Sequence, residues 1–268
     1  MINKISDEVL QDKCTWISCK IKKIQNENPI WSVVFCAYNE ENYLLPTLDS
    51  FTKIQTNLPI EIIAVNNNST DRTKEILEQS WIKVINENKK WISYARNTWL
   101  NEARWEIIFQ TDADTKIPST WIDSHYQHYF NNDIWWVSWW IKYEDVCILY
   151  YLYRFWAIGY HVFLDLIWKG PLCRGWANLS YRKDVASSVG WFTPWCDYWE
   201  DILLFDKLSK VSKVKSDKSK KITTITSWRR YKNSSQVIKQ IKDKIFSISE
   251  RISSNEVIPI NKTFKDAR

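Results

Sequence analysis

The stretch Trp31-Ser-Val-Val-Phe-Cys-Ala-Tyr-Asn-Glu-Glu41 joins a continuous apolar run to a group of polar side chains. The run from Ser32 to Ala37 is typical of a strand that is buried on both faces of a sheet. Apolar residues then recur at positions 44, 45, 48 and 51, which is the spacing of a helix with one buried face. The stretch therefore predicts the first strand and helix of an α/β fold.

Strands and helices continue to alternate up to residue 111. We predict strands over 60–65, 82–85 and 106–111, and helices over 69–79 and 92–103. Strands that are separated by single helices form a parallel sheet with right-handed crossovers. In such a doubly wound sheet, ligands bind at the carboxyl ends of the strands.

The second half of the chain is less regular. We predict a helix over 118–130, a strand over 134–143 and a short helix over 202–208. Residues 146–168 are strongly apolar, but Arg154, His161 and Asp165 interrupt them. Because ionisable groups are costly in hydrocarbon, this segment fits a partly buried or interfacial helix better than a membrane span.

The composition is that of a globular protein. The 268 residues include 37 Lys+Arg, 31 Asp+Glu and 45% hydrophobic residues, which excludes a disordered, collagen-like or coiled-coil chain. Six cysteines are scattered without a CxxC pair, which argues against a zinc site and against a disulfide scaffold. Residues 1–30 are polar and charged and show no signal peptide, so we expect a cytoplasmic protein.

Residues 207–232 hold ten Lys and Arg but a single acid, Asp217. This stretch is either a solvated basic surface or a surface that attracts anionic lipid or a phosphate-bearing substrate. Together with the apolar segment 146–168, it allows a peripheral contact with the inner face of the cell membrane. The stretch has little aromatic interleaving, so we do not expect nucleic-acid binding.

Four polar motifs are the candidates for chemistry. Three of them directly follow predicted strands and the fourth begins a predicted helix: Cys36-Ala-Tyr-Asn-Glu-Glu41, Val65-Asn-Asn-Asn-Ser-Thr-Asp71, Asp112-Ala-Asp114 and Trp199-Glu-Asp201. Because the carboxyl ends of parallel strands meet at one edge of a sheet, we expect the first three to lie together. Each motif alone is common by chance, but their order and spacing form a specific combination.

At these motifs the chain resembles the family 2 glycosyltransferases of the GT-A fold, over most of its length. The shared pieces are Ala37-Tyr-Asn-Glu40, Ser69-Thr-Asp71, Ala95-Arg-Asn97, Asp112-Ala-Asp114, Ala177-Asn178 and Glu200-Asp201. The resemblance implies a Rossmann-like, mostly parallel central sheet in a GT-A domain over 31–215. This domain would comprise a nucleotide-binding half (31–115) and an acceptor half (116–215), between an N-terminal extension (1–30) and a basic C-terminal tail (216–268).

The resemblance also implies a reaction, in which a sugar moves from a nucleoside diphosphate to an acceptor hydroxyl with inversion. Asp114 would ligate Mn²⁺ or Mg²⁺, and Asp112 would contact the ribose or the metal-bound water. Asp201 would be the general base that takes the acceptor proton, with Glu200 supporting it. The residue types alone leave two alternatives, a polar turn at 112–114 and carboxylates that only stabilise a helix N-terminus at 200–201.

Further residues are expected to bind the donor, a UDP- or GDP-sugar, whereas the acceptor would be a saccharide or a lipid-linked molecule. Asn66 stands where the family usually has an Asp that contacts the base, which leaves the identity of the base open. Arg96 could reach the diphosphate or hold the carboxylates of the metal site, and the alternative is a plain surface ion pair. The expected contacts of the nucleotide sugar are Ala37, Tyr38, Asn39, Glu40, Asn66, Arg96, Asp112, Ala113 and Asp114.

Two other functions are compatible with parts of the pattern. A nucleotidyltransferase would share the sheet and the metal-binding carboxylates, but the loop that contains Glu40-Glu41 is acidic and disfavours a triphosphate. A non-catalytic carbohydrate- or membrane-binding homologue is supported by Asn66 alone. Assays of nucleotide-sugar hydrolysis distinguish these possibilities.

The chain has 4 glycines and 18 tryptophans, whereas average usage predicts about 7% glycine. The resembling family has glycine at the positions of Trp91, Trp99 and Trp105. Some bacteria read the UGA codon as glycine, so a translation that assigns UGA to tryptophan would produce this pattern. We hypothesise that most of these tryptophans stand for glycine and that Trp121, where the family often has an aromatic residue, is genuine. The alternative is a Trp-rich protein with extensive aromatic packing.

Overall fold

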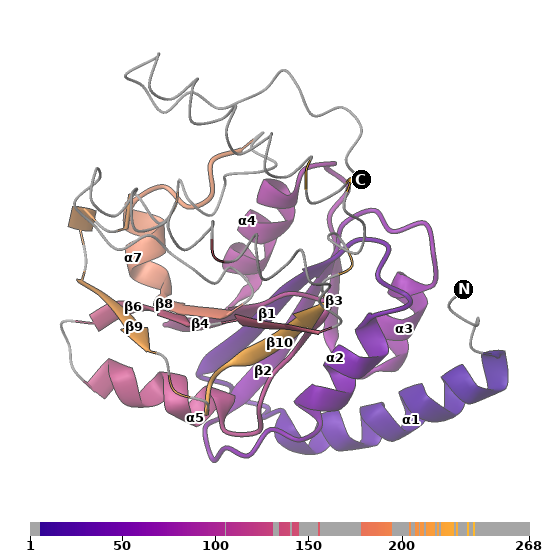
Figure 1. Ribbon diagram of the computed structural model, residues 1–268. Helices are drawn as coiled ribbons and strands as arrows, with labels where there is room; N and C mark the ends of the chain where they lie inside the picture. Colours follow the sequence, from indigo (N-terminus) through magenta and orange to yellow (C-terminus); the bar gives the residue numbers. More distant parts are fainter. Residues whose placement is uncertain are drawn as a thin grey trace. The chain divides into compact units, whose positions relative to one another are not determined.

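A seven-stranded sheet forms the centre of the computed structural model (Figure 1). Its strand order is β3-β2-β1-β4-β8-β6-β9. The strands are β1 (Trp31–Ala37), β2 (Ile60–Asn66), β3 (Lys83–Asn86), β4 (Ile107–Thr111), β6 (Ile134–Trp139), β8 (Asn178–Arg182) and β9 (Lys213–Asp217). Strand β8 is antiparallel to both of its neighbours and the other pairs are parallel, so six strands run in one direction. The predicted α/β fold with a mostly parallel central sheet is confirmed.

The structure describes part of the chain. The described residues are 6–104, 106–130, 134–139, 141–144, 155, 178–194, 204, 207, 208, 210, 211, 213–217, 219, 221–227, 229, 235 and 238. Glu200 and Asp201 therefore lie outside them, as do most of the predicted segments 146–168 and 202–208. In the described ranges, no helix combines the length and the apolar character that a membrane crossing requires.

Helices cover both faces of the central sheet (Figure 1). One face carries α1 (Asp7–Ile24), α2 (Leu44–Phe51), α3 (Thr73–Gln79), α5 (Trp121–Tyr126) and the 3₁₀ turn Gln127–Phe130, and the other face carries α4 (Ile92–Glu102) and α7 (Lys183–Ser188). Successive residues of β1 serve the two layers in turn, because side chains of a strand alternate between the faces of a sheet. Val33 and Phe35 pack in the first layer, and Val34 packs in the second.

Helix α1 belongs to the core of the fold, although it lies in the predicted N-terminal extension. Its inner face buries Leu10, Cys14, Ile17 and Ile21 against the first layer. One compact unit comprises Met1–Lys142 with Cys173–Thr226, and a second comprises Tyr143–Leu172 with Ser227–Arg268. The predicted limits at residues 30 and 215 do not coincide with this division.

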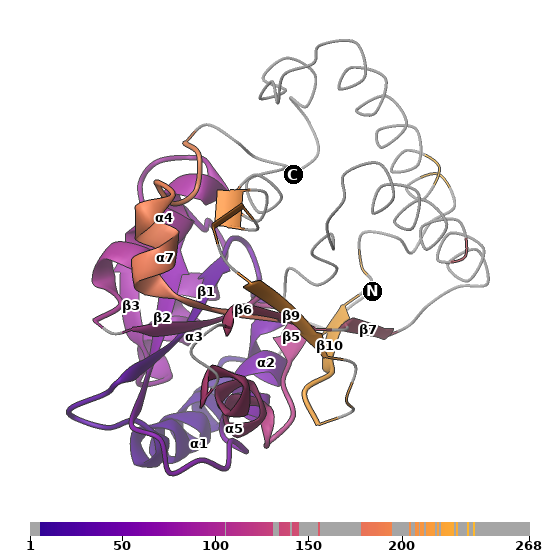
Figure 2. The ribbon, with the colours of Figure 1, turned by 90° about the vertical axis from the view of Figure 1, so that its left-hand side faces the viewer.

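A small second sheet has the order β5-β10-β7 (Figure 2). Its strands are β5 (Thr115–Lys116), β10 (Thr224–Ser227) and β7 (Ile141–Glu144). The prediction of one strand over 134–143 is wrong, because β6 and β7 divide this segment between two sheets. Strand β5 directly follows the Asp112-Ala-Asp114 motif, so this sheet joins the motif to a segment that lies more than 100 residues later in the sequence.

Candidate functional site

The carboxyl ends of three adjacent parallel strands bring three of the polar motifs to one edge of the central sheet. Strands β1 and β2 end in register, with Ala37 opposite Asn66, and β4 lies on the other side of β1 and ends at Thr111. The loops that begin at residues 38, 67 and 112 therefore leave the sheet side by side. Open α/β sheets bind their ligands at this position.

Asn39 links the loop after β1 to the loop after β2. Its backbone N–H donates to the Ser69 hydroxyl at 3.1 Å, and its side-chain oxygen accepts a hydrogen bond from the Thr70 N–H at 2.8 Å. Asn39 adopts a left-handed conformation with φ of 53°, which asparagine tolerates better than most residues. The Asn39 side chain therefore fixes the shape of the edge.

Three more hydrogen bonds join the same two loops through their acidic residues, and a fourth lies within the segment after β2. The N–H groups of Glu40 and Glu41 donate to the Thr73 hydroxyl at 2.7 Å and to Asp71 Oδ2 at 3.1 Å. In return, Glu41 Oε2 accepts from the Arg72 N–H at 3.1 Å, and Asp71 Oδ1 accepts from the Thr73 N–H at 2.9 Å. Carboxylates at this place satisfy the N–H groups at the start of α3, so Glu41 and Asp71 have structural roles.

The side chains expected at the base pocket differ in their exposure. Tyr38 is 38% exposed at the edge of the sheet, whereas Glu40 is 7% exposed. Ala37, at the end of β1, and Ala113, on the turn after β4, are buried. Of these four residues, Tyr38 therefore exposes the most side-chain surface on which the flat ring of a base could stack.

Asn66 is buried, and both ends of its amide contact the protein. Its Nδ2 donates to Asn86 Oδ1 at 2.9 Å, and its Oδ1 accepts from the Ser69 N–H at 3.3 Å. Sequence reasoning missed Asn86, which occupies the last position of β3 and thus the carboxyl end of the next parallel strand. That position is the signal that could have identified it.

Asp112 and Asp114 lie on a tight turn between β4 and β5. The Asp112 carbonyl accepts a hydrogen bond from the Thr115 N–H at 3.2 Å, and Ala113 is buried between the two half-buried acids. Asp114 Oδ1 also lies 3.2 Å from the hydroxyl oxygen of Thr226. Sequence reasoning missed Thr226, because nothing in its local sequence connects it with a motif 112 residues earlier.

The two acids suit a divalent cation that is bound together with a phosphate-bearing ligand. Within the described ranges, no three His, Cys, Asp or Glu side chains gather as a metal site. Mg²⁺ commonly binds through one or two carboxylates and takes its other ligands from substrate phosphates and water. Carboxylate oxygens also suit Mn²⁺. The turn therefore offers a partial ligand set of the right chemistry.

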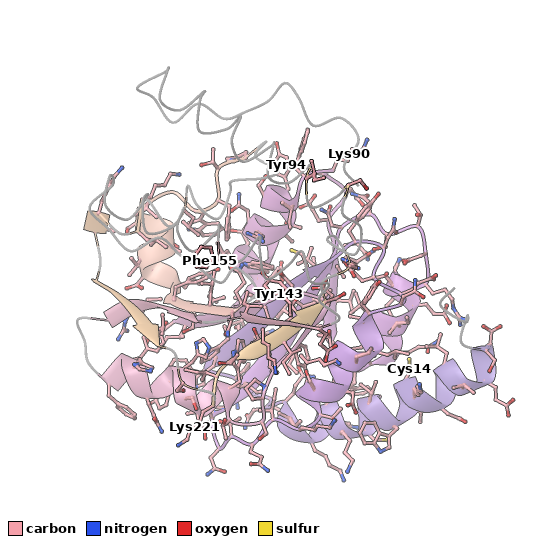
Figure 3. The ribbon with its side chains drawn as sticks, viewed as in Figure 1. Cys14, Lys90, Tyr94, Tyr143, Phe155 and Lys221 are labelled. Atoms are coloured by element: carbon pink, nitrogen blue, oxygen red, sulfur yellow. The ribbon has the colours of Figure 1, made fainter. Side chains whose placement is uncertain are left out.

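Arg96 lies in the interior, on α4, with 4% of its surface exposed. Its guanidinium carbon is 5.3 Å from the centre of the Phe192 ring. Burial raises the pKa of the neighbouring Tyr181 hydroxyl, and the Trp99 side chain and the positive charge of Arg96 act in the opposite direction. The alternative of a surface ion pair for Arg96 is wrong. Lys90 and Tyr94, labelled in Figure 3, mark the start of this helix.

Three comparisons with known proteins bear on the site. Residues 32–189 match the family model described as Glycosyl transferase family 2. The chain is 35% identical over 101 residues to glycosyltransferase GlyA of Streptococcus pneumoniae. That alignment covers 36% of this chain and 14% of GlyA, so the chain spans a small part of the length of this relative.

Solved structures with low sequence identity share the fold. Residues 1–349 of Staphylococcus aureus TarS, in complex with UDP-GlcNAc, align with a TM-score of 0.57 and 18% identity, over 74% of this chain and 58% of that one. The mannosyltransferase PcManGT of Pyrobaculum calidifontis, in complex with GDP-Man and Mn²⁺, aligns with a TM-score of 0.59 and 14% identity. This alignment covers 93% of this chain and 78% of PcManGT.

Proposed function

This chain belongs to glycosyl transferase family 2, and we propose that it transfers a sugar from a nucleoside diphosphate to an acceptor hydroxyl. One observation carries the proposal. The loops after β1 and β2 are hydrogen-bonded to each other, and the Asp112-Ala-Asp114 turn leaves the neighbouring strand at the same edge. This edge offers an aromatic ring, at Tyr38, and a pair of carboxylates, at Asp112 and Asp114, to one ligand.

The carboxylate pair is proposed to hold the diphosphate end of the donor through Mn²⁺ or Mg²⁺. Asp114 would ligate the cation, and Asp112 would contact the ribose or a metal-bound water. A bound divalent cation neutralises the charge that develops on the departing nucleoside diphosphate. Arg96 is a further candidate for this end of the donor, because α4 begins directly after the loop that follows β3.

The base is proposed to bind beside Tyr38, at the edge that the loops after β1 and β2 form. Asn66 differs from the Asp that the family usually has there, and its amide contacts Ser69 and Asn86. We propose a UDP- or GDP-sugar as the donor, since solved structures of the same fold hold UDP-GlcNAc and GDP-Man. The exposed Tyr38 ring can stack on either base.

The transfer itself is proposed to be a single displacement with inversion. The acceptor oxygen forms its bond to the anomeric carbon while the bond from that carbon to the diphosphate oxygen breaks. The acceptor proton passes to the carboxylate of Asp201, which Glu200 supports. The acceptor is proposed to be a saccharide or a lipid-linked molecule, and the segments 146–168 and 207–232 are the proposed places of a peripheral membrane contact.

Product analysis tests this function. The purified chain is incubated with Mn²⁺ and a panel of UDP- and GDP-sugars, and the released nucleotides are separated by chromatography. We expect the chain to release UDP or GDP from one or a few donors. Asp112→Asn is expected to reduce this release at least tenfold. Asp12→Asn, at an exposed position on α1, is the control and is expected to leave the release unchanged. Pyrophosphate release from a nucleoside triphosphate and a sugar phosphate would indicate a nucleotidyltransferase. No turnover of any donor would indicate a binding protein.

A further inference from the structure

Strand β10 lies beside β5, the strand that directly follows the acidic turn at 112–114 (Figure 2). It pairs antiparallel with β5, so that Thr226 lies opposite Thr115. The Thr226 hydroxyl oxygen is 2.9 Å from the Thr115 hydroxyl oxygen and 3.2 Å from Asp114 Oδ1. The residue that follows Asp114 and the carboxylate of Asp114 thus contact the same hydroxyl group.

The directions of these hydrogen bonds follow from the number of protons. A carboxylate can only accept, and a threonine hydroxyl donates one proton. The Thr115 O–H donates to Thr226, which leaves the Thr226 O–H for Asp114. The Asp114 carbonyl is at 3.5 Å, so the carboxylate at 3.2 Å is the better acceptor. A hydrogen bond to a carboxylate is charge-assisted and therefore stronger than one between neutral groups.

Two contacts hold the segment that leads into β10. The Thr120 hydroxyl donates to the Lys221 carbonyl at 2.7 Å, and the Asn178 Nδ2 donates to the Ile222 carbonyl at 2.8 Å. Ile222 is 1% exposed and packs in the same core layer as α5. Figure 3 shows Lys221 on the α5 side of the sheet. These contacts therefore hold Lys221 and Ile222 in place, at the start of the segment that continues to Thr226.

Buried neighbours of Asn178 determine which way its side-chain amide is oriented. Its Oδ1 accepts a hydrogen bond from the Trp121 indole N–H at 2.7 Å, and an indole nitrogen can only donate. His125 Nε2 lies 3.2 Å from the same oxygen and must also donate, while the Ser180 hydroxyl at 2.7 Å from Nδ1 supplies the other partner. Asn178 Nδ2 therefore points to Ile222.

From this geometry we propose that Thr226 is a positioning residue, which orients the Asp114 carboxylate for the divalent cation of the donor. The proposal rests on the proposed function, since it takes that cation as the ligand of Asp114. It adds the segment 221–226 to the donor site. The contact between Thr226 and Asp114 thus joins the last residue of the first compact unit to the acidic turn.

Removal of one hydroxyl group tests the proposal. Thr226→Val keeps the shape of the side chain and removes its O–H, and Thr226→Ser keeps the O–H. Mn²⁺ is titrated into each full-length protein in the presence of UDP and, separately, of GDP, and free Mn²⁺ is followed by electron paramagnetic resonance. We expect Thr226→Val to weaken Mn²⁺ binding about 10–100-fold, as the loss of a partner of a metal ligand commonly does, and Thr226→Ser to restore it to within about threefold.

Thr224 supplies the matched control. It is buried on the same strand and the same face as Thr226, and its hydroxyl oxygen has no hydrogen-bond partner in the described part of the chain. Thr224→Val is therefore expected to leave Mn²⁺ binding unchanged. Equal losses in Thr224→Val and Thr226→Val, or no loss in either, would overturn the proposal.

A metal-free measurement separates this proposal from the proposed function. In EDTA, the urea midpoint is measured for the wild type, Thr226→Val, Asp114→Ala and the double variant. We expect Thr226→Val to lower the midpoint in the wild type and to have little further effect in Asp114→Ala, because the contact is already lost. If Thr226→Val lowers the urea midpoint equally in the wild type and in Asp114→Ala, the two side chains do not stabilise each other and the proposal fails. A different result is that the urea midpoints show the expected coupling between Thr226 and Asp114 while the chain binds neither Mn²⁺ nor nucleotide. That result overturns the proposed function, and with it the role of Thr226 in metal binding.

Discussion

Asn97 and Phe192 exchange two hydrogen bonds across 95 residues of sequence. The Asn97 Nδ2 donates to the Phe192 carbonyl at 3.0 Å, and the Phe192 N–H donates to Asn97 Oδ1 at 3.1 Å. The amide thereby ties α4 to the segment 190–194, which precedes the Glu200-Asp201 motif in the sequence. The asparagine of the Ala95-Arg-Asn97 motif is thus explained by a backbone contact.

Replacement of Asn97 by alanine is expected to lower the free energy of unfolding by about 1–3 kcal/mol, because one backbone donor and one backbone acceptor lose their partner. Urea denaturation measures this loss. Asn101→Ala provides the control, since Asn101 is exposed on the same helix and its removal is expected to cost less than about 0.5 kcal/mol. Equal effects of the two substitutions would contradict the structural role of Asn97.

Two tryptophans in the described part of the chain have a backbone conformation that suits glycine. Trp81 and Trp191 have φ of 56° and 58°, where a residue with a side chain costs about 1–2 kcal/mol. Lys22 lies 4.6 Å from the centre of the Trp81 ring, a contact worth about 0.5–1 kcal/mol when exposed. We therefore expect Trp81→Gly to leave the stability unchanged or to raise it by up to about 1 kcal/mol.

Trp16 is the matched control for Trp81. It is also exposed and also faces a lysine, Lys20, but it lies inside α1, where glycine is unfavourable. Trp16→Gly is expected to lower the unfolding free energy by about 1 kcal/mol in the same denaturation assay. A larger loss for Trp81→Gly than for Trp16→Gly would contradict the interpretation of the backbone at residue 81.

The hypothesis that tryptophans stand for glycine is tested directly by the gene. We expect UGA at the codons of Trp91, Trp99 and Trp105, and UGG at the codon of Trp121. The Trp121 ring is buried, and its indole N–H donates to Asn178, which is a role that glycine cannot take. UGG codons at the first three positions would end the hypothesis.

Stability is expected to fall as the pH is lowered from 7 to 5.5. Burial holds the pKa of His125 well below its ordinary value, so the folded state keeps this side chain neutral. The unfolded chain binds a proton near pH 6.5, and the free energy of unfolding therefore decreases by up to about 1.4 kcal/mol per pH unit below that pH. Denaturant titrations over this range measure the slope.

His125→Gln is expected to remove most of this slope, whereas His128→Gln, at a half-buried position in the next turn, is expected to retain it. The two variants share the loss of one histidine and differ in burial. A slope that persists unchanged in His125→Gln would show that other groups cause the pH dependence.

The sequence predicts the strands and helices up to residue 111, because each buried strand there is a short apolar run and each helix has a regular apolar spacing. It also predicts which three motifs meet at the edge of the sheet, since this follows from parallel strands. The contacts that fix the acidic turn are different. Thr226 and Asn178 act through hydrogen bonds between distant segments, and a threonine in a polar stretch looks the same whether or not it contacts a carboxylate.

Helix α1 shows a second reason why the predicted organisation of the chain differs from the structure. Its apolar residues at 10, 14, 17 and 21 have helical spacing, but the surrounding residues are charged, and the segment lies outside the part that resembles the family. A boundary taken from a resemblance therefore omitted an element that packs in the core. The division of 134–143 into β6 and β7 has a similar origin, because an apolar run does not show where a chain changes sheets.

Asp201→Asn is expected to abolish sugar transfer while it changes donor binding less than about threefold, because an amide cannot take the proton of the acceptor. Transfer is measured with the donor that the product analysis identifies, and donor binding is measured by calorimetry. Glu200→Gln is expected to have a smaller effect on turnover. Turnover of Asp201→Asn at the rate of the wild type would remove Asp201 from its proposed role.

The most direct test of the account is a calorimetric titration of UDP and GDP into the full-length chain, with Mn²⁺ and again with EDTA. If the acids at 112 and 114 hold a cation that binds the diphosphate, one of the two nucleotides binds at least tenfold more tightly with Mn²⁺, and Asp114→Ala removes this difference. Equal binding with Mn²⁺ and with EDTA, or a Mn²⁺ effect that survives in Asp114→Ala, would contradict the proposed donor site.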